Sequence, residues 1–168
     1  MLSESDRLSR YFFDEVSESE VPRYIIGHLS ALVVRLTWLY RLNAQYHFYK
    51  SIFGHSQVIS PGIDIANISR VIDVGTGTGA WAHDFASQPE VQERNLQIFA
   101  CDIDDTKFLQ GNGLTAKHVS FFQQDVTKPF PDELLGTFDL VNVLLLCCAL
   151  TSQGWEMALQ NLRSLLSE

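Results

Sequence analysis

Residues 69–82 have the sequence SRVIDVGTGTGAWA, and this stretch decides the fold predicted for the chain. The Val-Ile-Asp-Val run at 71–74 is typical of a short buried strand. Gly75, Gly77 and Gly79 let the backbone turn sharply and approach a ligand closely. A helix is expected to begin at once, with free N–H groups that favour an anion or a nucleotide. The stretch therefore predicts a ligand-binding strand–turn–helix.

The glycine turn fits two kinds of nucleotide site. Gly75, Gly77 and Ala80 meet the dinucleotide pattern G-x-G-x-x-G/A, with Asp102 as the later acidic residue. Asp73 and the alternating glycines form D-x-G-x-G-x-G, which resembles motif I of the class I S-adenosylmethionine (SAM) dependent methyltransferases. In that family a carboxylate at the strand end helps to orient the methionine part of the cofactor. The plainer alternative is a strand-to-helix turn whose glycines serve packing alone.

The length and composition predict one globular domain with a small-molecule partner. The chain has 168 residues, of which 46% are hydrophobic, so it can bury a sizeable core. With 12 basic and 20 acidic residues, a net charge of −8 argues against nucleic acid or an anionic membrane as partner. Cys101, Cys147 and Cys148 have neither disulfide nor metal-site spacing, so we expect buried thiols and no metal.

No targeting or membrane segment is expected. The amino terminus lacks the basic and apolar regions of a signal peptide. The longest apolar run, residues 140–150, is far shorter than the ~20 residues that cross a bilayer. These features predict a soluble, cytoplasmic protein.

Two helical segments are predicted before the glycine turn. Residues 1–20 are acidic and aromatic, as in a lightly docked helix. Apolar residues recur at helical spacing from Pro22 toward Gly54, with a break near Asn43 as an open alternative. So much apolar surface must cover the sheet, a substrate or a second subunit.

Strands and helices are predicted to alternate after the turn. Further strands are expected at 96–101, 119–123 and 138–146, and a last helix at 153–166. The strand at 138–146 is almost wholly apolar, as in a strand buried on both faces. Four alternations predict a parallel α/β sheet with right-handed crossovers.

Acidic residues follow two of these strands, where ligands gather in doubly wound sheets. Asp102 is placed to accept hydrogen bonds from two ribose hydroxyls, and Asp125 from the adenine amine. Helix capping by Asp102 or Asp104 is the alternative to the ribose role, and capping by Asp125 is the alternative to the adenine role. His83 is expected to pack or meet solvent rather than act as a base, and no histidine is assigned a catalytic role.

The region 63–168 is similar to the class I methyltransferases, and more narrowly to the LaeA-like methyltransferases of fungal secondary metabolism. Tyr46, Asn142 and Leu144 depart from that group, which has histidine, histidine and arginine there. The segments that carry the resemblance are RLNAQ at 41–45, DVGTGTGAWA at 73–82, DFA at 84–86, CDI at 101–103 and FDLV at 138–141.

The resemblance implies a Rossmann-like class I methyltransferase fold, truncated after about four strands. Residues 1–60 would form a helical lid for substrate or dimerisation, and residues 61–168 a SAM-binding core. Tyr40 and Gln45 would be further lid contacts. The cofactor-binding residues would be Asp73, Gly75, Thr76, Gly77, Asp102, Ile103, Asp125, Val126, Asn142 and Arg41.

Two functions are expected from different classes. The first is SAM-dependent methylation of a small secondary-metabolite acceptor, an in-line displacement that needs no metal or covalent residue. The second is a truncated pseudo-methyltransferase that serves as a partner subunit or catalyses a non-methylating reaction. A nicotinamide-dependent dehydrogenase is a distant third. The exposed edge of the fourth strand also predicts a homo- or hetero-oligomer.

Overall fold

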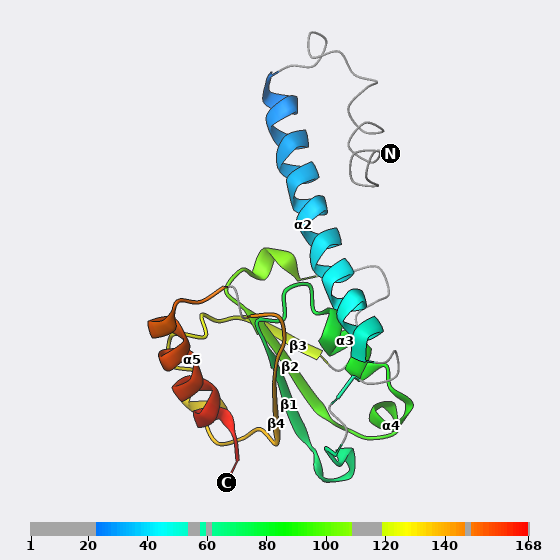
Figure 1. Cartoon of the computed structure of the whole chain (residues 1–168), viewed down its shortest axis with the longest axis vertical. Coiled ribbons are helices and arrows are strands. Elements are labelled where there is room, and N and C mark those ends of the chain that lie inside the picture. The colour runs from blue at the N-terminus through cyan, green and yellow to red at the C-terminus, as the bar shows by residue number, and fades with distance from the viewer. Residues whose placement is uncertain (1–22, 54–57, 60–61, 109–118, 147–148, 168) are drawn as a thin grey trace. The chain divides into compact units, whose positions relative to one another are not determined.

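The computed structural model describes residues 23–53, 58–59, 62–108, 119–146 and 149–167 (Figure 1). The chain divides into two compact units between Tyr40 and Arg41. The helix predicted over residues 1–20 lies outside the described residues. The predicted boundary between lid and core at residue 60 stays a prediction.

Helix α2 runs without interruption over Arg23–Phe53. The alternative of a break near Asn43 is therefore wrong. No glycine or proline lies between His28 and Phe53, so nothing local interrupts the helical hydrogen bonds. From Arg41 onward α2 belongs to the same compact unit as the sheet.

The sheet has four parallel strands in the order β3-β2-β1-β4 (Figure 1). Its central pair is β1 (Arg70–Val74) and β2 (Gln97–Asp102). Its outer strands are β3 (Val119–Gln123) and β4 (Leu140–Val143). The predicted parallel α/β fold is confirmed, and the carboxyl ends of all four strands lie at one edge.

Two helices lie in the connection from β1 to β2, and a third follows β4. They are α3 (Ala80–Ala86), α4 (Pro89–Gln92) and α5 (Ser152–Leu165), and a 3-10 turn, η1 (Ile65–Asn67), precedes β1.

The other connections differ from the predicted alternation. Between β3 and β4 the chain forms only a 3-10 turn, η3 (Asp132–Leu134), so the helix expected there is wrong. Pro129, Pro131 and Gly136 explain this, since each disfavours a helix interior. Between β2 and β3 the described part contains the 3-10 turn η2 (Asp105–Lys107), and residues 109–118 lie outside it.

Strand β4 is shorter than the predicted strand at 138–146. It ends at Val143, and Leu145 then adopts a φ of 58°, which takes the chain out of the extended conformation. All four β4 residues are half-buried, so the expectation of a strand buried on both faces is also wrong. Beside it, Phe138 forms an isolated parallel bridge with Leu166.

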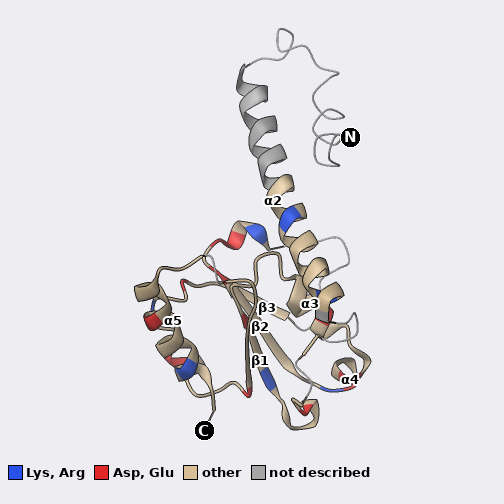
Figure 2. Cartoon of the chain, in the orientation of Figure 1, with Lys and Arg blue, Asp and Glu red and all other residues tan. Residues whose placement is uncertain are grey.

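Two hydrophobic clusters flank β1, whose successive side chains point to opposite faces. Val71 packs with Trp81 and Phe85 of α3, whose rings stack 5.1 Å apart. Ile72 packs in a second cluster that includes Ala158, Leu162 and Leu165 of α5. These clusters fix the end of β1, and hence the glycine turn, in place. Figure 2 shows the described basic residues scattered singly rather than gathered on one element.

Candidate cofactor site

The turn after β1 is built by glycines in the left-handed region. The φ values are 73° at Gly75, 60° at Gly77 and 83° at Gly79. The Gly75 and Thr76 amides donate to the Cys101 carbonyl at 2.8 and 2.9 Å, extending the pairing of β1 with β2. Gly79 N–H donates to the Thr76 carbonyl at 3.0 Å.

These three amides are therefore occupied, whereas the expectation of free N–H groups at the start of α3 stays a prediction. The Gly77 amide is also occupied, because it donates to Oδ2 of Asp102 at 2.9 Å. The turn closes upon itself and on β2, so these amides are not available to cradle a pyrophosphate. This geometry disfavours the dinucleotide alternative.

Asp73 lies at the end of β1 and is 2% exposed. Its Oδ2 accepts from Thr76 Oγ1 at 2.5 Å, and its Oδ1 from Asn142 Nδ2 at 2.7 Å. Burial raises the pKa of Asp73 to about 6, while the two hydrogen bonds act in the opposite direction. The structure thus brings three of the predicted site residues into one hydrogen-bonded group.

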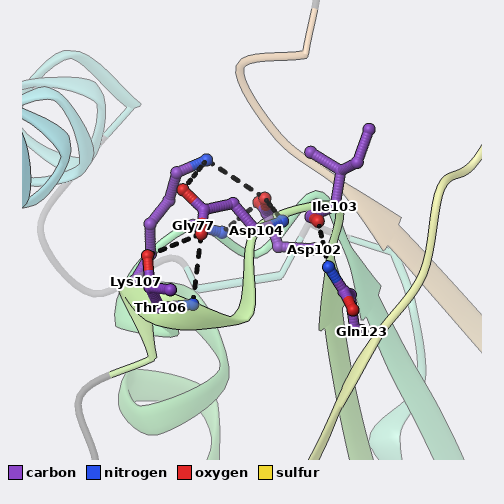
Figure 3. Close-up of polar contacts among 7 residues, drawn as sticks. All are labelled: Gly77, Asp102, Ile103, Asp104, Thr106, Lys107 and Gln123. Carbon is purple, nitrogen blue, oxygen red and sulfur yellow. Dashed lines mark hydrogen bonds and ion pairs between the residues drawn. The ribbon is translucent and has the colours of Figure 1, made fainter.

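Asp102 occupies the corresponding place at the end of β2. Besides the Gly77 amide, it accepts at Oδ1 from Asp104 N–H at 3.1 Å and from Lys107 Nζ at 3.2 Å (Figure 3). Its side chain remains 10% exposed. The neighbouring Ile103 is exposed, and its carbonyl accepts from Gln123 Nε2 at 2.8 Å.

Asp125 forms a local turn in the structure. Its Oδ1 accepts from Thr127 N–H at 2.9 Å and from Thr127 Oγ1 at 2.7 Å, as in the capping alternative. These bonds hold the pKa of Asp125 below its usual range. Val126 is buried in the cluster that includes α5. Contact of either residue with a cofactor stays a prediction.

The carboxyl-terminal part of α2 packs against the glycine turn and α3. Thr78 Oγ1 donates to Asn43 Oδ1 at 2.6 Å. Tyr46 and Lys50 both donate to Oδ2 of Asp84, the lysine at 2.6 Å.

The lid residues differ in their exposure to solvent and in the compact unit to which they belong. Burial and the neighbouring Asp84 raise the pKa of Tyr46. Arg41 and Gln45 are exposed, and Tyr40 belongs to the other compact unit.

Asp104 caps η2 through Thr106 N–H, as the capping alternative expected. Asn43 and Lys107 were not singled out from the sequence. Lys107 lies five residues after Asp102, a spacing that matches neither helix nor strand periodicity. The Asn43 contact joins positions 35 residues apart, so no local pattern marks it.

Among the residues that the structure describes, the remaining candidate groups form no catalytic cluster. His83 packs against the Phe121 ring at 5.4 Å, and burial lowers its pKa. Cys101 is a buried free thiol, as predicted, while Cys147 and Cys148 lie outside the described residues. Within the described ranges no group of His, Cys, Asp and Glu could hold a metal. Within the part of the chain that the structure describes, no helix combines the length and the apolar character of a membrane span.

Comparison with known proteins identifies the family. The methyltransferase domain family matches residues 71–168, which include all four strands and α5. The chain belongs to this methyltransferase family. The resemblance to class I methyltransferases is thereby confirmed, and SAM is the cofactor of this family.

Two fungal relatives of this family member are similar in sequence. Methyltransferase grgD of a Penicillium species is 33% identical over 133 residues, which cover 75% of this chain and 44% of grgD. The secondary metabolism regulator LAE1 of Hypocrea atroviridis is 30% identical over 110 residues, 65% of this chain and 29% of LAE1. The chain therefore spans less than half the length of these curated relatives.

Solved structures with the methyltransferase fold support the architecture. A TehB-like SAM-dependent methyltransferase from Corynebacterium glutamicum has a TM-score of 0.52 at 16% identity, over 74% of this chain and 65% of that one. The CMeT domain of the citrinin polyketide synthase has a TM-score of 0.51 at 15% identity, over 59% of this chain and 26% of that one. At these identities the likeness concerns the fold alone.

Proposed function

We propose that this chain binds SAM at the carboxyl ends of β1 and β2 and transfers its methyl group to a small acceptor. The observation that carries the proposal is the pair of carboxylates, Asp73 and Asp102, on either side of one glycine turn. Asp102 is tied to that turn through the Gly77 amide at 2.9 Å. In this arrangement one acid can face the methionine ammonium and the other the ribose diol.

Each carboxylate suits a different part of the cofactor. SAM has a methionine ammonium and a ribose diol but no pyrophosphate, which agrees with a turn in which the Gly75, Thr76, Gly77 and Gly79 amides are already occupied. Buried Asp73 would complement the ammonium by charge, and Asp102 would accept from the diol. The full set of proposed cofactor residues is Arg41, Asp73, Gly75, Thr76, Gly77, Asp102, Ile103, Asp125, Val126 and Asn142.

Methyl transfer from a sulfonium is an in-line displacement, so positioning and exclusion of water are the main tasks of the protein. His83 packs against the Phe121 ring and is not assigned the role of a base. The proposed reaction therefore depends on alignment. The α2 segment after Arg41, which contacts Thr78 and Asp84, supplies one wall beside the turn.

A secondary-metabolite type of acceptor is the finer part of the proposal. It is supported by sequence similarity to methyltransferase grgD and to the regulator LAE1. The acidic net charge of −8 further favours a small acceptor over nucleic acid.

Calorimetric titration of SAM and S-adenosylhomocysteine (SAH) into the purified chain tests the proposal. Saturation at about 100 times the dissociation constant should add about 2.7 kcal/mol of stability, visible as a higher melting temperature. Asp102→Ala should remove most of the affinity, whereas Asp105→Ala, an exposed acid in η2, should not. Equal affinity in the Asp102 variant would refute the site. Transfer is then measured separately with labelled SAM and candidate acceptors.

We further propose that β4 associates with a second chain. Among the described strands β4 pairs only with β1, which leaves its other side open beyond the bridge at Phe138. Light scattering at tens of micromolar tests this, and a strict monomer would contradict it.

A further inference from the structure

Lys107 lies beside the carboxylate proposed to bind ribose. Its Nζ is 3.2 Å from Oδ1 of Asp102 and 3.8 Å from Oδ2 of Asp104. The Lys107 side chain is 28% exposed, while that of Asp102 is 10% exposed. Figure 3 shows the lysine reaching back from η2 toward both acids. Asp102 is therefore largely shielded from solvent, whereas Lys107 is partly exposed to it.

The acceptor positions of Asp102 are nearly filled by the protein itself. A carboxylate oxygen accepts about two hydrogen bonds. Oδ1 already has two donors, the Asp104 amide at 3.1 Å and Lys107 Nζ. Oδ2 has one, the Gly77 amide. A ribose diol bound through both oxygens therefore finds room at Oδ2 but must displace a donor from Oδ1.

Lys107 is the donor that can leave. The Asp104 amide is fixed by the turn that starts η2, where Asp104 Oδ1 caps Thr106 N–H at 3.2 Å and accepts from Thr106 Oγ1 at 2.6 Å. The ammonium of Lys107, by contrast, ends a side chain with four rotatable bonds. Its second neighbour, Asp104 Oδ2, is already within 4 Å. The lysine keeps its ion pair with Asp104 when it leaves Asp102.

We propose that Lys107 occupies the ribose carboxylate in the free chain and moves to Asp104 when a ribose diol binds. The inference rests on the proposed function, because Asp102 must be the ribose acceptor. Lys107 then sets the affinity and the selectivity of the ribose subsite. A ligand with both hydroxyls replaces the lost ion pair with two hydrogen bonds. A ligand without a 2′-hydroxyl replaces it poorly and binds more weakly.

The test compares SAH affinity among variants by calorimetry. Lys107→Met keeps the aliphatic stem and removes the competing ammonium, so SAH should bind about three- to fivefold more tightly, the range of a partly exposed ion pair. Asp104→Asn keeps the capping oxygen but removes the second partner of the lysine, so affinity should fall about two- to threefold. In the Lys107→Met background, Asp104→Asn should have no effect. Arg163→Met, at an exposed cation of α5, controls for net charge and should leave affinity unchanged.

A second ligand localises the effect. 5′-Methylthioadenosine retains the ribose and lacks the amino acid part, so the gain from Lys107→Met should persist with it. Unchanged or weaker binding by Lys107→Met, while Asp102→Ala abolishes binding, would overturn the role of Lys107 and leave the proposed function standing. Absence of SAH binding in every folded chain, wild type included, would refute the proposed function and this inference together.

Discussion

Asn142 of β4 is the register partner of Asp73 of β1, and its side-chain amide donates to Asp73 Oδ1 at 2.7 Å. The other oxygen of Asp73 accepts from Thr76 Oγ1 at 2.5 Å. Both donors are neutral, so they stabilise the ionised carboxylate without cancelling its charge. Burial acts in the opposite direction and raises the pKa of Asp73 to about 6. Asn142 therefore contributes to holding the negative charge that the methionine ammonium would meet.

SAH affinity should accordingly rise with pH through about 6, the pKa of Asp73, because only the ionised carboxylate attracts the ammonium. The charge of Asp102 also raises the pKa of Asp73, while Tyr46 and Cys101 have pKa values raised by burial and stay neutral in this range. Asn142→Ala removes one stabilising donor, so the pH midpoint of the rise in SAH affinity should lie about one pH unit higher in this variant. Calorimetry across this pH range measures both midpoints.

5′-Methylthioadenosine is the matched control for this prediction. It has no ammonium, so its affinity should not follow the ionisation of Asp73. An SAH affinity that is constant across pH 6, or equal midpoints in the wild type and Asn142→Ala, would contradict the assigned role of Asp73.

The burial of His83 predicts that the free energy of unfolding falls on acidification. Both of its ring nitrogens are buried without a hydrogen-bond partner in the described structure, and burial lowers its pKa below the usual 6.5. The unfolded chain therefore takes up the proton first. This contribution to stability is complete above pH 6.5 and is lost as the pH falls through the lowered pKa of the folded state.

His83→Phe should remove that contribution to the pH dependence. It keeps an aromatic ring against Phe121, 5.4 Å away, and removes two unsatisfied nitrogens. We expect a gain of about 1 kcal/mol at neutral pH. Urea unfolding of both chains at about pH 7.5 and pH 5.5 measures it. Identical slopes with pH would show that the ring is protonated equally in the folded and unfolded states.

Substitutions at Gly79 and Gly136 distinguish the cost of backbone strain from the cost of steric conflict. Its φ is 83°, and an added Cβ would lie 2.8 Å from two ring carbons of Phe121. Gly79→Ala should therefore lower the free energy of unfolding by about 2–4 kcal/mol. Gly136→Ala has a similar φ of 65° but nothing within 4 Å, so it should cost only about 1–2 kcal/mol. Equal losses in urea unfolding would mean that Phe121 moves aside freely.

The fold was predictable from the sequence because its signals are local. The β-branched run at 71–74 and the glycines after it specify strand β1 and its turn without reference to distant residues. Parallel pairing then brings the ends of β1 and β2 together, which places Asp73 near Asp102.

The remaining details depend on contacts between distant segments. The amides of Gly75 and Thr76 are occupied by a carbonyl of β2, and no pattern in the turn reveals this. The pairing of Lys107 with Asp102 depends on the path of η2. The early end of β4 depends on the left-handed conformation of Leu145, a residue type that rarely adopts it.

The contacts of Asp84 predict that this carboxylate holds α2 against α3. Its Oδ2 accepts from Tyr46 Oη and from Lys50 Nζ, so one oxygen serves two donors of the helix. Asp84→Ala leaves the buried Tyr46 hydroxyl and the lysine without this acceptor, at a cost of about 1–3 kcal/mol. The loss should appear as faster hydrogen exchange in residues 41–53, measured by mass spectrometry. Asn43→Ala removes only the bond from Thr78 and should have a smaller effect. If exchange in 41–53 is unchanged in the Asp84 variant, apolar packing rather than this carboxylate holds the helix.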